Sequence, residues 1–170
     1  MIKNKIFFFT ILIFLTQCGY QTIYSNKNLN FSVTQIKILN DQNIGRQIRN
    51  RLGLLSSNTN ADNLNLEIDS KFEKTTASKD KQGNPNVFNL SIFVRVNVTS
   101  ESGIEQSKVF SEAINYNNSE NKFNLKKYEE SLKENLTEKI IEDLLLYLQS
   151  ISVNLELQMH ANLFELTQYN

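Results

Sequence analysis

The chain has 170 residues, 40% of them hydrophobic and 21% charged, which suffices for one domain with a substantial core but not comfortably for two. Basic and acidic residues number 18 each, and without Lys3 and Lys5 the balance is 16 to 18. This balance argues against a nucleic-acid-binding protein, and a single cysteine excludes a disulfide within one chain.

The first eighteen residues have the parts of an export signal. Lys3 and Lys5 form a positively charged region ahead of the apolar run IFFFTILIFL, Ile6 to Leu15. A membrane-spanning helix needs roughly 20 apolar residues, and this run is much shorter. We therefore interpret residues 1–17 as a signal peptide that is removed.

Cys18 follows the apolar run, with Leu15 three positions before it. This arrangement resembles the end of a bacterial lipoprotein signal, in which the thiol receives a diacylglycerol and the new amino terminus is acylated, commonly with palmitate. Three acyl chains, at about 0.8 kcal/mol per buried methylene, hold a protein in a membrane almost permanently. We predict that Cys18 is the lipidation site and that residues 18–30 form a lipid-anchored tether.

Two other interpretations of Cys18 stay open. Gln17 departs from the small residue that normally precedes a lipidated cysteine, so the apolar run would remain as an uncleaved anchor if Gln17 blocks processing. A lone cysteine near a terminus can also be an ordinary buried thiol. Residue 19 is glycine and not aspartate, so nothing demands retention in the inner membrane. We expect the outer membrane, with the protein lipid-anchored on the periplasmic side.

The first predicted elements are a strand and a helix. Apolar alternation predicts a strand over Phe31–Leu39, with an irregularity near Gln35 that fits a bulge. Asn40 and Asp41 are helix-capping residues. Apolar residues then recur at helical spacing, at Ile44, Ile48, Leu52 and Leu55. Three arginines fall on the other side of this helix, as a solvated face or as a site: Arg46, Arg49 and Arg51.

Three further strands are predicted. Asn63–Lys74 alternates strictly, and Thr75–Asn86 is loop-like because it contains Gly83 and the only proline. Val87–Thr99 has the clearest alternation in the chain. Ile104–Tyr116 pairs back on it as a hairpin.

A long helix closes the predicted domain, with an apolar stripe from Leu125 to Ile151 at spacings of three and four. The order strand, helix, three strands, helix predicts an α+β two-layer sandwich, in which a four-stranded mixed sheet packs on two helices on one face. Residues 31–151 form this domain, and residues 152–170 are an extension whose structure the pattern does not determine.

The sequence predicts no catalytic centre, metal site or cofactor other than the acyl chains. His160 is the only histidine, whereas acid–base catalysis or a zinc site usually needs histidine in company, so we interpret it as structural. The five glycines are isolated and form no phosphate-binding loop. Glu129 and Glu130 have the pattern of an exposed helix surface with lysines nearby. We expect a protein that is not an enzyme.

Three stretches of the chain resemble the sequence pattern of one known protein family. CGYQTIY, from Cys18 to Tyr24, is similar to the mature start of that family. RQIRNRL, from Arg46 to Leu52, resembles its Arg-Asn-x-Leu pattern on the first helix. SKVFSEAINYNNSENKF, from Ser107 to Phe123, resembles its fourth strand and the step into its last helix. These stretches resemble the LptE family of lipopolysaccharide-assembly outer-membrane lipoproteins, and the resemblance covers the chain from Cys18 to about Leu148.

The resemblance implies a non-enzymatic part of a transport machine. LptE proteins sit as a plug inside the LptD β-barrel, help it fold and help lipopolysaccharide reach the cell surface. The resemblance also implies lipopolysaccharide contacts from basic residues before the third strand and near the start of the last helix. The matching positions are Lys81, Lys126 and Lys127, with Lys122 as a further candidate. Such cations would meet lipid A phosphates, and the alternative is that they are solvated lysines.

A second hypothesis belongs to a different class of function. The chain would be an independent envelope lipoprotein that binds a small apolar ligand or a cell-wall component, or acts on the latter, on the same sandwich. This hypothesis predicts a deep pocket with converging polar groups. The plug hypothesis instead predicts a stoichiometric complex with a large outer-membrane barrel.

Overall fold

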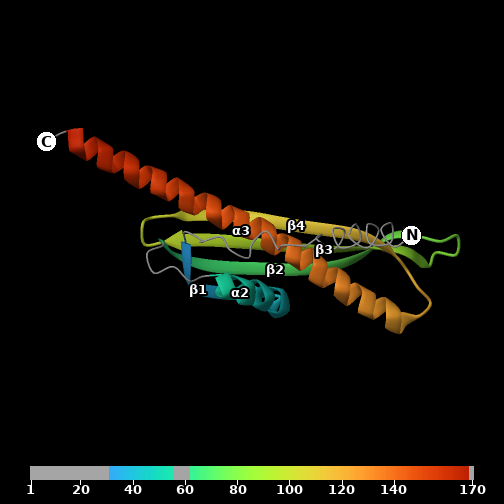
Figure 1. Ribbon diagram of the computed structural model, residues 1–170. Coiled ribbons are helices and arrows are strands. Elements are labelled where there is room, and N and C mark those ends of the chain that lie inside the picture. The colour runs from blue at the N-terminus through green and yellow to red at the C-terminus, as the bar shows by residue number, and fades with distance from the viewer. Residues whose placement is uncertain (1–30, 56–61, 169–170) are drawn as a thin grey trace, which may run out of the picture.

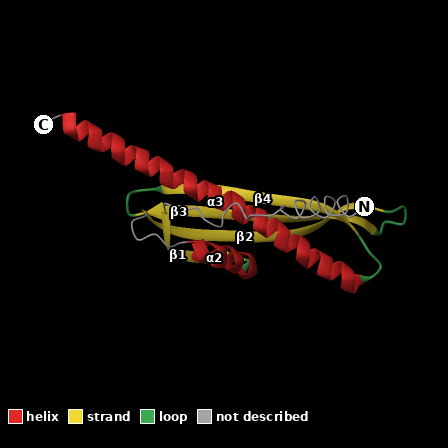
Figure 2. Ribbon diagram, viewed as in Figure 1, coloured by secondary structure: helices red, strands yellow, loops and turns green. Residues whose placement is uncertain are grey.

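The computed structural model describes residues 31–55 and 62–168, so Cys18 and the tether lie outside the described residues. The elements are β1 (Phe31–Asn40), α2 (Gln42–Leu55), β2 (Asp62–Lys79), β3 (Pro85–Ser100), β4 (Glu105–Asn117) and α3 (Lys122–Gln168) (Figure 1). The four strands form one sheet in the order β1-β2-β3-β4. Both helices cover the same face of this sheet (Figure 2). The predicted α+β two-layer sandwich, in the order β-α-β-β-β-α, is confirmed.

The sheet is mixed because its first two strands are joined by a helix and the others by turns. β1 runs parallel to β2, whereas β2–β3 and β3–β4 are antiparallel. Parallel neighbours need a crossover connection, which α2 supplies. The irregularity expected near Gln35 is present as a register shift between Val33 and Gln35. Pairing of β1 ends at Asn40 opposite Ser70, so the distal half of β2 extends past β1.

The core lies between the sheet and the two helices. Strand alternation turns one set of side chains toward the helices, and in the central strands these are fully buried: Leu64, Leu66, Ile68, Leu90, Ile92, Val94, Val96 and Val98. Ile44, Ile48 and Leu52 of α2 pack on them together with the apolar stripe of α3. Each such aliphatic side chain contributes roughly 1.5–3 kcal/mol by its burial, so this layer supplies most of the cohesion.

The hairpin of β2 and β3 is longer than the sequence pattern predicts. β2 continues to Lys79 instead of ending at Lys74, and Lys79 pairs with Pro85 at the start of β3. Thr, Ala and Ser in this segment give no alternating signal, so its strand conformation follows from pairing with β3. The expected loop over Thr75–Asn86 is thereby reduced to a tight turn.

Local contacts fix the start of α2 against β1. The Asp41 carboxylate accepts hydrogen bonds from the backbone N of Asn43 (2.9 Å) and Ile44 (3.2 Å), so Asp41 is the N-cap. Gly45 faces Ile38 on β1, and a Cβ at Gly45 would lie 2.2 Å from Ile38 Cγ2. The missing side chain therefore allows α2 to pack this close to β1.

α3 continues without interruption through residue 168, beyond its last described buried residue, Ser152. Its C-terminal part projects past the end of the sheet (Figure 1). A helix of 47 residues is roughly 70 Å long, which exceeds the length that the sheet covers. Within the described residues, neither helix combines the length and hydrophobicity needed to cross a bilayer.

Candidate functional site

One end of the molecule contains the lysines to which the family resemblance assigns lipopolysaccharide contacts. The β2–β3 turn and the start of α3 lie at this end (Figure 1). Asn118 joins them, because its backbone N donates to the Asn86 carbonyl and its Nδ2 to the Pro85 carbonyl, both at 2.8 Å. We call residues 79–86 together with 118–129 the basic end.

Asp80 fixes the conformation of the β2–β3 turn. Its carboxylate accepts hydrogen bonds from the backbone N of Asn84 (2.8 Å) and Gln82 (2.9 Å). These bonds, the one from Asn84 foremost, lower the pKa of Asp80. Gly83 has a φ of 87°, a conformation that favours glycine. The turn thus presents Lys81, which is exposed, from a defined backbone.

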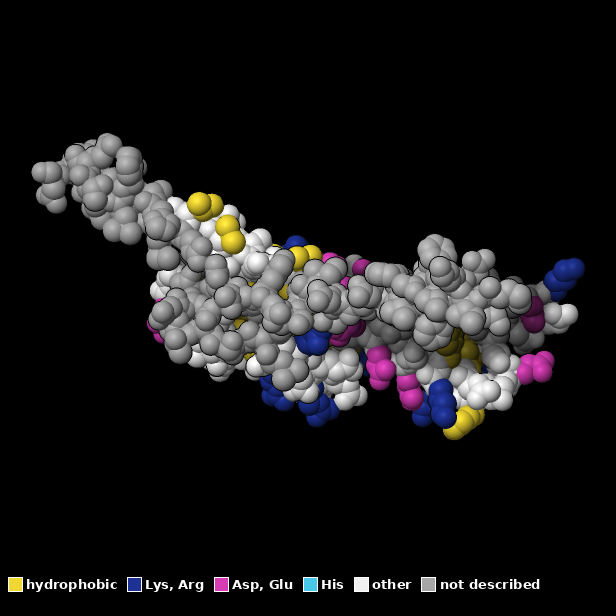
Figure 3. Space-filling model, in the orientation of Figure 1, with side chains coloured by type: hydrophobic (Ala, Val, Ile, Leu, Met, Phe, Trp, Pro, Cys, Tyr) yellow, Lys and Arg dark blue, Asp and Glu magenta, His cyan; other side chains and the backbone are white. Residues whose placement is uncertain are grey.

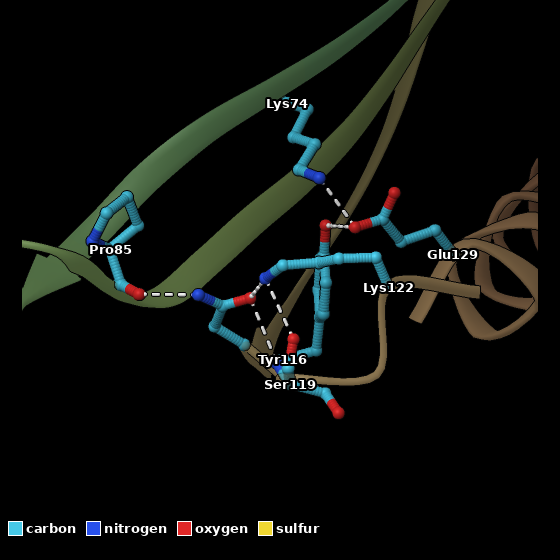
Figure 4. Close-up of polar contacts among 7 residues, drawn as sticks. Lys74, Pro85, Tyr116, Ser119, Lys122 and Glu129 are labelled. Atoms are coloured by element: carbon cyan, nitrogen blue, oxygen red, sulfur yellow. Dashed lines mark hydrogen bonds and ion pairs between the residues drawn. The ribbon is translucent and has the colours of Figure 1, made fainter. Parts of the chain in front are cut away.

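Lys122 closes the connection between β4 and α3. Its Nζ donates to Asn118 Oδ1 and to the Ser119 carbonyl, each at 2.8 Å (Figure 4). Asn118 Oδ1 also accepts from the backbone N of Ser119 at 2.9 Å. Lys122 therefore holds the chain in place, and its ammonium group is already partnered.

Lys126 and Lys127 are exposed near the start of α3. Lys127 Nζ lies 4.7 Å from the ring centroid of Phe123, which is 68% exposed. Figure 3 shows basic side chains at both the hairpin tip and the start of α3, with a hydrophobic one beside the latter. The first turn of α3 contains no acidic residue, although the helix dipole favours one there. Lysines outnumber acidic residues in the basic end by five to three, and Figure 3 shows acidic side chains at this end as well. The region therefore presents an excess of ammonium groups beside an apolar ring, which suits an anionic amphiphile.

Glu129 is not part of an exposed helix surface, so that prediction is wrong. Its Oε1 accepts a hydrogen bond from the Tyr116 hydroxyl (2.8 Å) and forms an ion pair with Lys74 Nζ (2.5 Å) (Figure 4). Lys74 Nζ also lies 4.3 Å from the ring centroid of Phe88. The spacing on α3 could not reveal this contact, because Lys74 and Tyr116 come from β2 and β4.

At neutral pH the Glu129 carboxylate is ionised and the Tyr116 hydroxyl is protonated. Burial raises the pKa of Glu129, but hydrogen bonds from Lys74 and Tyr116 outweigh it, and the net shift is downward. Burial, and then the bond to Glu129, raise the pKa of Tyr116 well above its ordinary value. A carboxylate and a protonated phenol locked together in this way hold α3 on the sheet.

Two of the three arginines of α2 lie on a solvated surface, whereas Arg51 is half-buried. Arg46 and Arg49 are exposed, and Arg46 donates to Asn43 Oδ1 at 2.7 Å on the same helix. Arg51 forms an ion pair of 3.2 Å with Glu138 and so links α2 to α3.

The opposite, open face of the sheet carries a groove of about 570 Å³. Polar side chains predominate in its lining. Lys37 pairs with Glu67 at 2.7 Å, and Ser107 donates to Asn97 Oδ1 at 2.7 Å. Such a lining suits a ligand rich in hydroxyl groups better than an apolar one.

The part of the chain that the structure describes offers no candidate metal site. No group of three or more His, Cys, Asp or Glu residues converges there. The backbone of His160 lies in α3, and its side chain is outside the described part.

Comparison with known proteins identifies the fold. No protein-family profile matches the sequence, and no curated protein matches it. The crystal structure of rare lipoprotein B from Shewanella oneidensis has a TM-score of 0.59 and 22% identity, covering 72% of this chain and 98% of that one. The NMR structure of an uncharacterized lipoprotein B from Nitrosomonas europaea has a TM-score of 0.54 and 14% identity, covering 81% and 93%. The chain therefore shares its fold with these proteins.

Proposed function

We propose that this chain is a cell-envelope lipoprotein, held in the outer membrane on the periplasmic side by a diacylglycerol and an N-acyl chain on Cys18. The observation that carries the proposal is the shared fold, which extends over 98% of a protein named as a lipoprotein. The placement of Cys18 directly after an apolar leader supports it independently.

Labelling cells with radioactive palmitate tests the anchor. The protein incorporates label, and Cys18→Ser abolishes it. Gln17→Ala restores the usual small residue before the cysteine, so it keeps the label and speeds removal of the leader. Label that survives Cys18→Ser contradicts the anchor, and a full-length leader on the labelled protein indicates that Gln17 blocks cleavage.

We further propose that the protein acts as LptE proteins do, as plug and assembly partner of an LptD-like barrel in lipopolysaccharide transport. The support is the resemblance of three stretches together with the character of the open sheet face. The interior of a large outer-membrane barrel is polar, so a plug needs a polar outer surface. The open face supplies one, with Asn65, Glu67, Asn97 and Ser107 among its residues.

Lys81, Lys126 and Lys127 are the proposed lipopolysaccharide contacts. All three are exposed at the basic end, and Phe123 adds an exposed ring beside Lys127. Lipid A combines phosphates with acyl chains, and this surface combines ammonium groups with an apolar ring. Lys122 is the weaker candidate, because Asn118 and Ser119 already occupy two of the three donors of its ammonium group. None of these roles requires catalysis, and we propose none.

The second candidate function is an independent lipoprotein that binds a cell-wall component, and the groove on the open face favours it. Its polar lining fits a glycan better than the small apolar ligand first considered. Isothermal titration with soluble peptidoglycan fragments tests it. Saturable binding that Asn97→Ala weakens supports this function, and absence of heat at every fragment tested removes it.

A further inference from the structure

The outward face of α3 changes character along the helix. Positions 135, 139 and 142 on this face are Asn, Lys and Glu. From residue 146 onward the same stripe is mainly apolar, interrupted at Ser150 and His160. Its apolar side chains that are described are exposed: Leu146 by 49%, Val153 by 43% and Leu157 by 63%. Leu144, Leu148 and Ile151 meanwhile face the core. The helix therefore has a second apolar stripe that its own domain does not use.

This stripe lies where α3 leaves the sheet. Figure 3 shows hydrophobic side chains along the outer edge of the helix there, and Figure 1 shows the helix projecting beyond the strands. Positions 146, 150, 153, 157, 160 and 164 of α3 alternate in spacing between four and three. That spacing is typical of the seam of a two-helix coiled coil. We call these six positions the outer seam.

The outer seam is complementary to itself in the antiparallel direction. An antiparallel pairing centred on residue 155 sets position 146 against 164, 150 against 160 and 153 against 157. The residues so matched are Leu with Phe, Ser with His and Val with Leu. Apolar positions therefore meet apolar ones and polar positions meet polar ones, as a twofold-symmetric interface requires.

The charges favour the same arrangement. Residues 140–168 contain four acidic residues and no Lys or Arg: Glu142, Asp143, Glu156 and Glu165. A parallel, in-register pair would bring the acidic residues of the two helices to the same heights along the axis, where like charges repel one another. The antiparallel register sets them opposite residues 168, 167, 154 and 145, which are Gln, Thr, Asn and Leu. An acidic segment also disfavours an anionic lipid surface as the occupant.

We propose that the outer seam is where a second copy of this chain binds, with the two α3 helices antiparallel. This interface is independent of the proposed plug function. Because the two helices run antiparallel, the two domains lie at opposite ends of the helix pair. Each domain packs on the side of its own helix that faces away from the seam.

Light scattering on the purified full chain in nonionic detergent, carrying Cys18→Ser, tests the proposal without any barrel. The expected protein mass is twice the 19.7 kDa of one chain. Val153→Asn with Leu157→Asn returns it to one chain and leaves the circular-dichroism spectrum unchanged, because both side chains are exposed on the single chain. Val109→Asn, which alters an exposed residue on the sheet, leaves the dimer intact. A single-chain mass for the parent protein, or a dimer that survives the double substitution, overturns the proposal.

Disulfide cross-linking tests the direction of pairing. Chains with Val153→Cys and chains with Leu157→Cys, both also carrying Cys18→Ser, are mixed and oxidised. The antiparallel register gives several-fold more mixed disulfide than either chain gives with itself. A predominance of disulfides between two copies of the Val153→Cys chain contradicts the register.

Discussion

The hydroxyl of Tyr116 on β4 donates a 2.8 Å hydrogen bond to Glu129 on α3, and Lys74 on β2 reaches the same carboxylate oxygen at 2.5 Å. Three elements thus meet at one atom, beyond the point where β1 stops pairing at Ser70. The part of the β2–β3 hairpin beyond Ser70 has no pairing with β1. The contact at Glu129 and the buried residue Leu125 hold the start of α3 on this part of the sheet. The position of the basic end depends on it.

Removing the Tyr116 hydroxyl should therefore destabilise the fold. A hydrogen bond to a charged group contributes about 1.5–3 kcal/mol, and we expect Tyr116→Phe to lower the free energy of unfolding by roughly this amount. Urea denaturation measures it. Tyr128→Phe is the matched control, because Tyr128 is 51% exposed, and it should cost under about 0.5 kcal/mol. Equal losses in both variants would contradict the role of Tyr116.

Stability should fall in acid because several carboxylates have lowered pKa values in the folded protein, and Asp41 and Glu129 are the two that are partly buried. Burial opposes the shift in both Asp41 and Glu129. At Asp41, hydrogen bonds from Lys133, Ile44 and Asn43 outweigh the effect of burial and lower the pKa. At Glu129, hydrogen bonds from Lys74 and Tyr116 do the same. A carboxylate of this kind stabilises the fold above its unfolded pKa, and that stability is lost as pH falls through the lower folded pKa.

Urea titrations at a series of pH values measure this loss. The free energy of unfolding should hold steady at neutral pH and decline below about 4.5, the ordinary value for a glutamate. Asp41→Asn keeps an oxygen for capping but removes one titrating group, so its decline should be shallower. An Asp41→Asn curve parallel to the parent curve in acid would exclude Asp41 as a source.

Two glycines of α2 should respond in opposite directions to alanine. At Gly45 a Cβ would lie 2.2 Å from Ile38 Cγ2, and overpacking of this kind costs about 1–3 kcal/mol. At Gly53 a Cβ meets nothing within 4 Å, so helix propensity should stabilise the protein by up to about 1 kcal/mol. Thermal unfolding of the two variants compares them directly. A neutral Gly45→Ala would mean that α2 does not lie this close to β1.

Lipopolysaccharide binding should depend on the basic end. Replacing Lys81, Lys126 and Lys127 together by Gln should weaken binding at least about tenfold, or 1.4 kcal/mol. The difference should shrink as salt is added. Lys139→Gln is the control, since Lys139 is exposed but paired with Glu112 at 3.6 Å. Fluorescence titration with lipopolysaccharide micelles measures both, and an unaffected triple variant would remove these lysines from the proposal.

Much of the fold could be predicted because strand and helix periods are local properties. Alternation along Val87–Thr99 and the helical spacing of Ile44, Ile48 and Leu52 correctly predicted both elements and the buried faces. The capping role of Asp41 and the bulge near Gln35 were also local signals.

What could not be predicted depends on contacts between distant segments. The segment from Thr75 to Lys79 becomes strand because β3 pairs with it, and Glu129 becomes a partnered carboxylate because two strands reach it. Likewise, the sequence gives no reason to distinguish Lys122 from Lys126 and Lys127. The difference is that Lys122 donates hydrogen bonds to Asn118 and Ser119 in the folded chain.

The central claim, that this chain is the plug of an outer-membrane barrel, is tested most directly by purifying it from its native cells. After cross-linking and detergent extraction, affinity purification should yield the chain in stoichiometric complex with one large LptD-like β-barrel, and mass spectrometry should identify that barrel. Recovery of this chain only, whether as a monomer or as the proposed antiparallel dimer, would contradict the plug function.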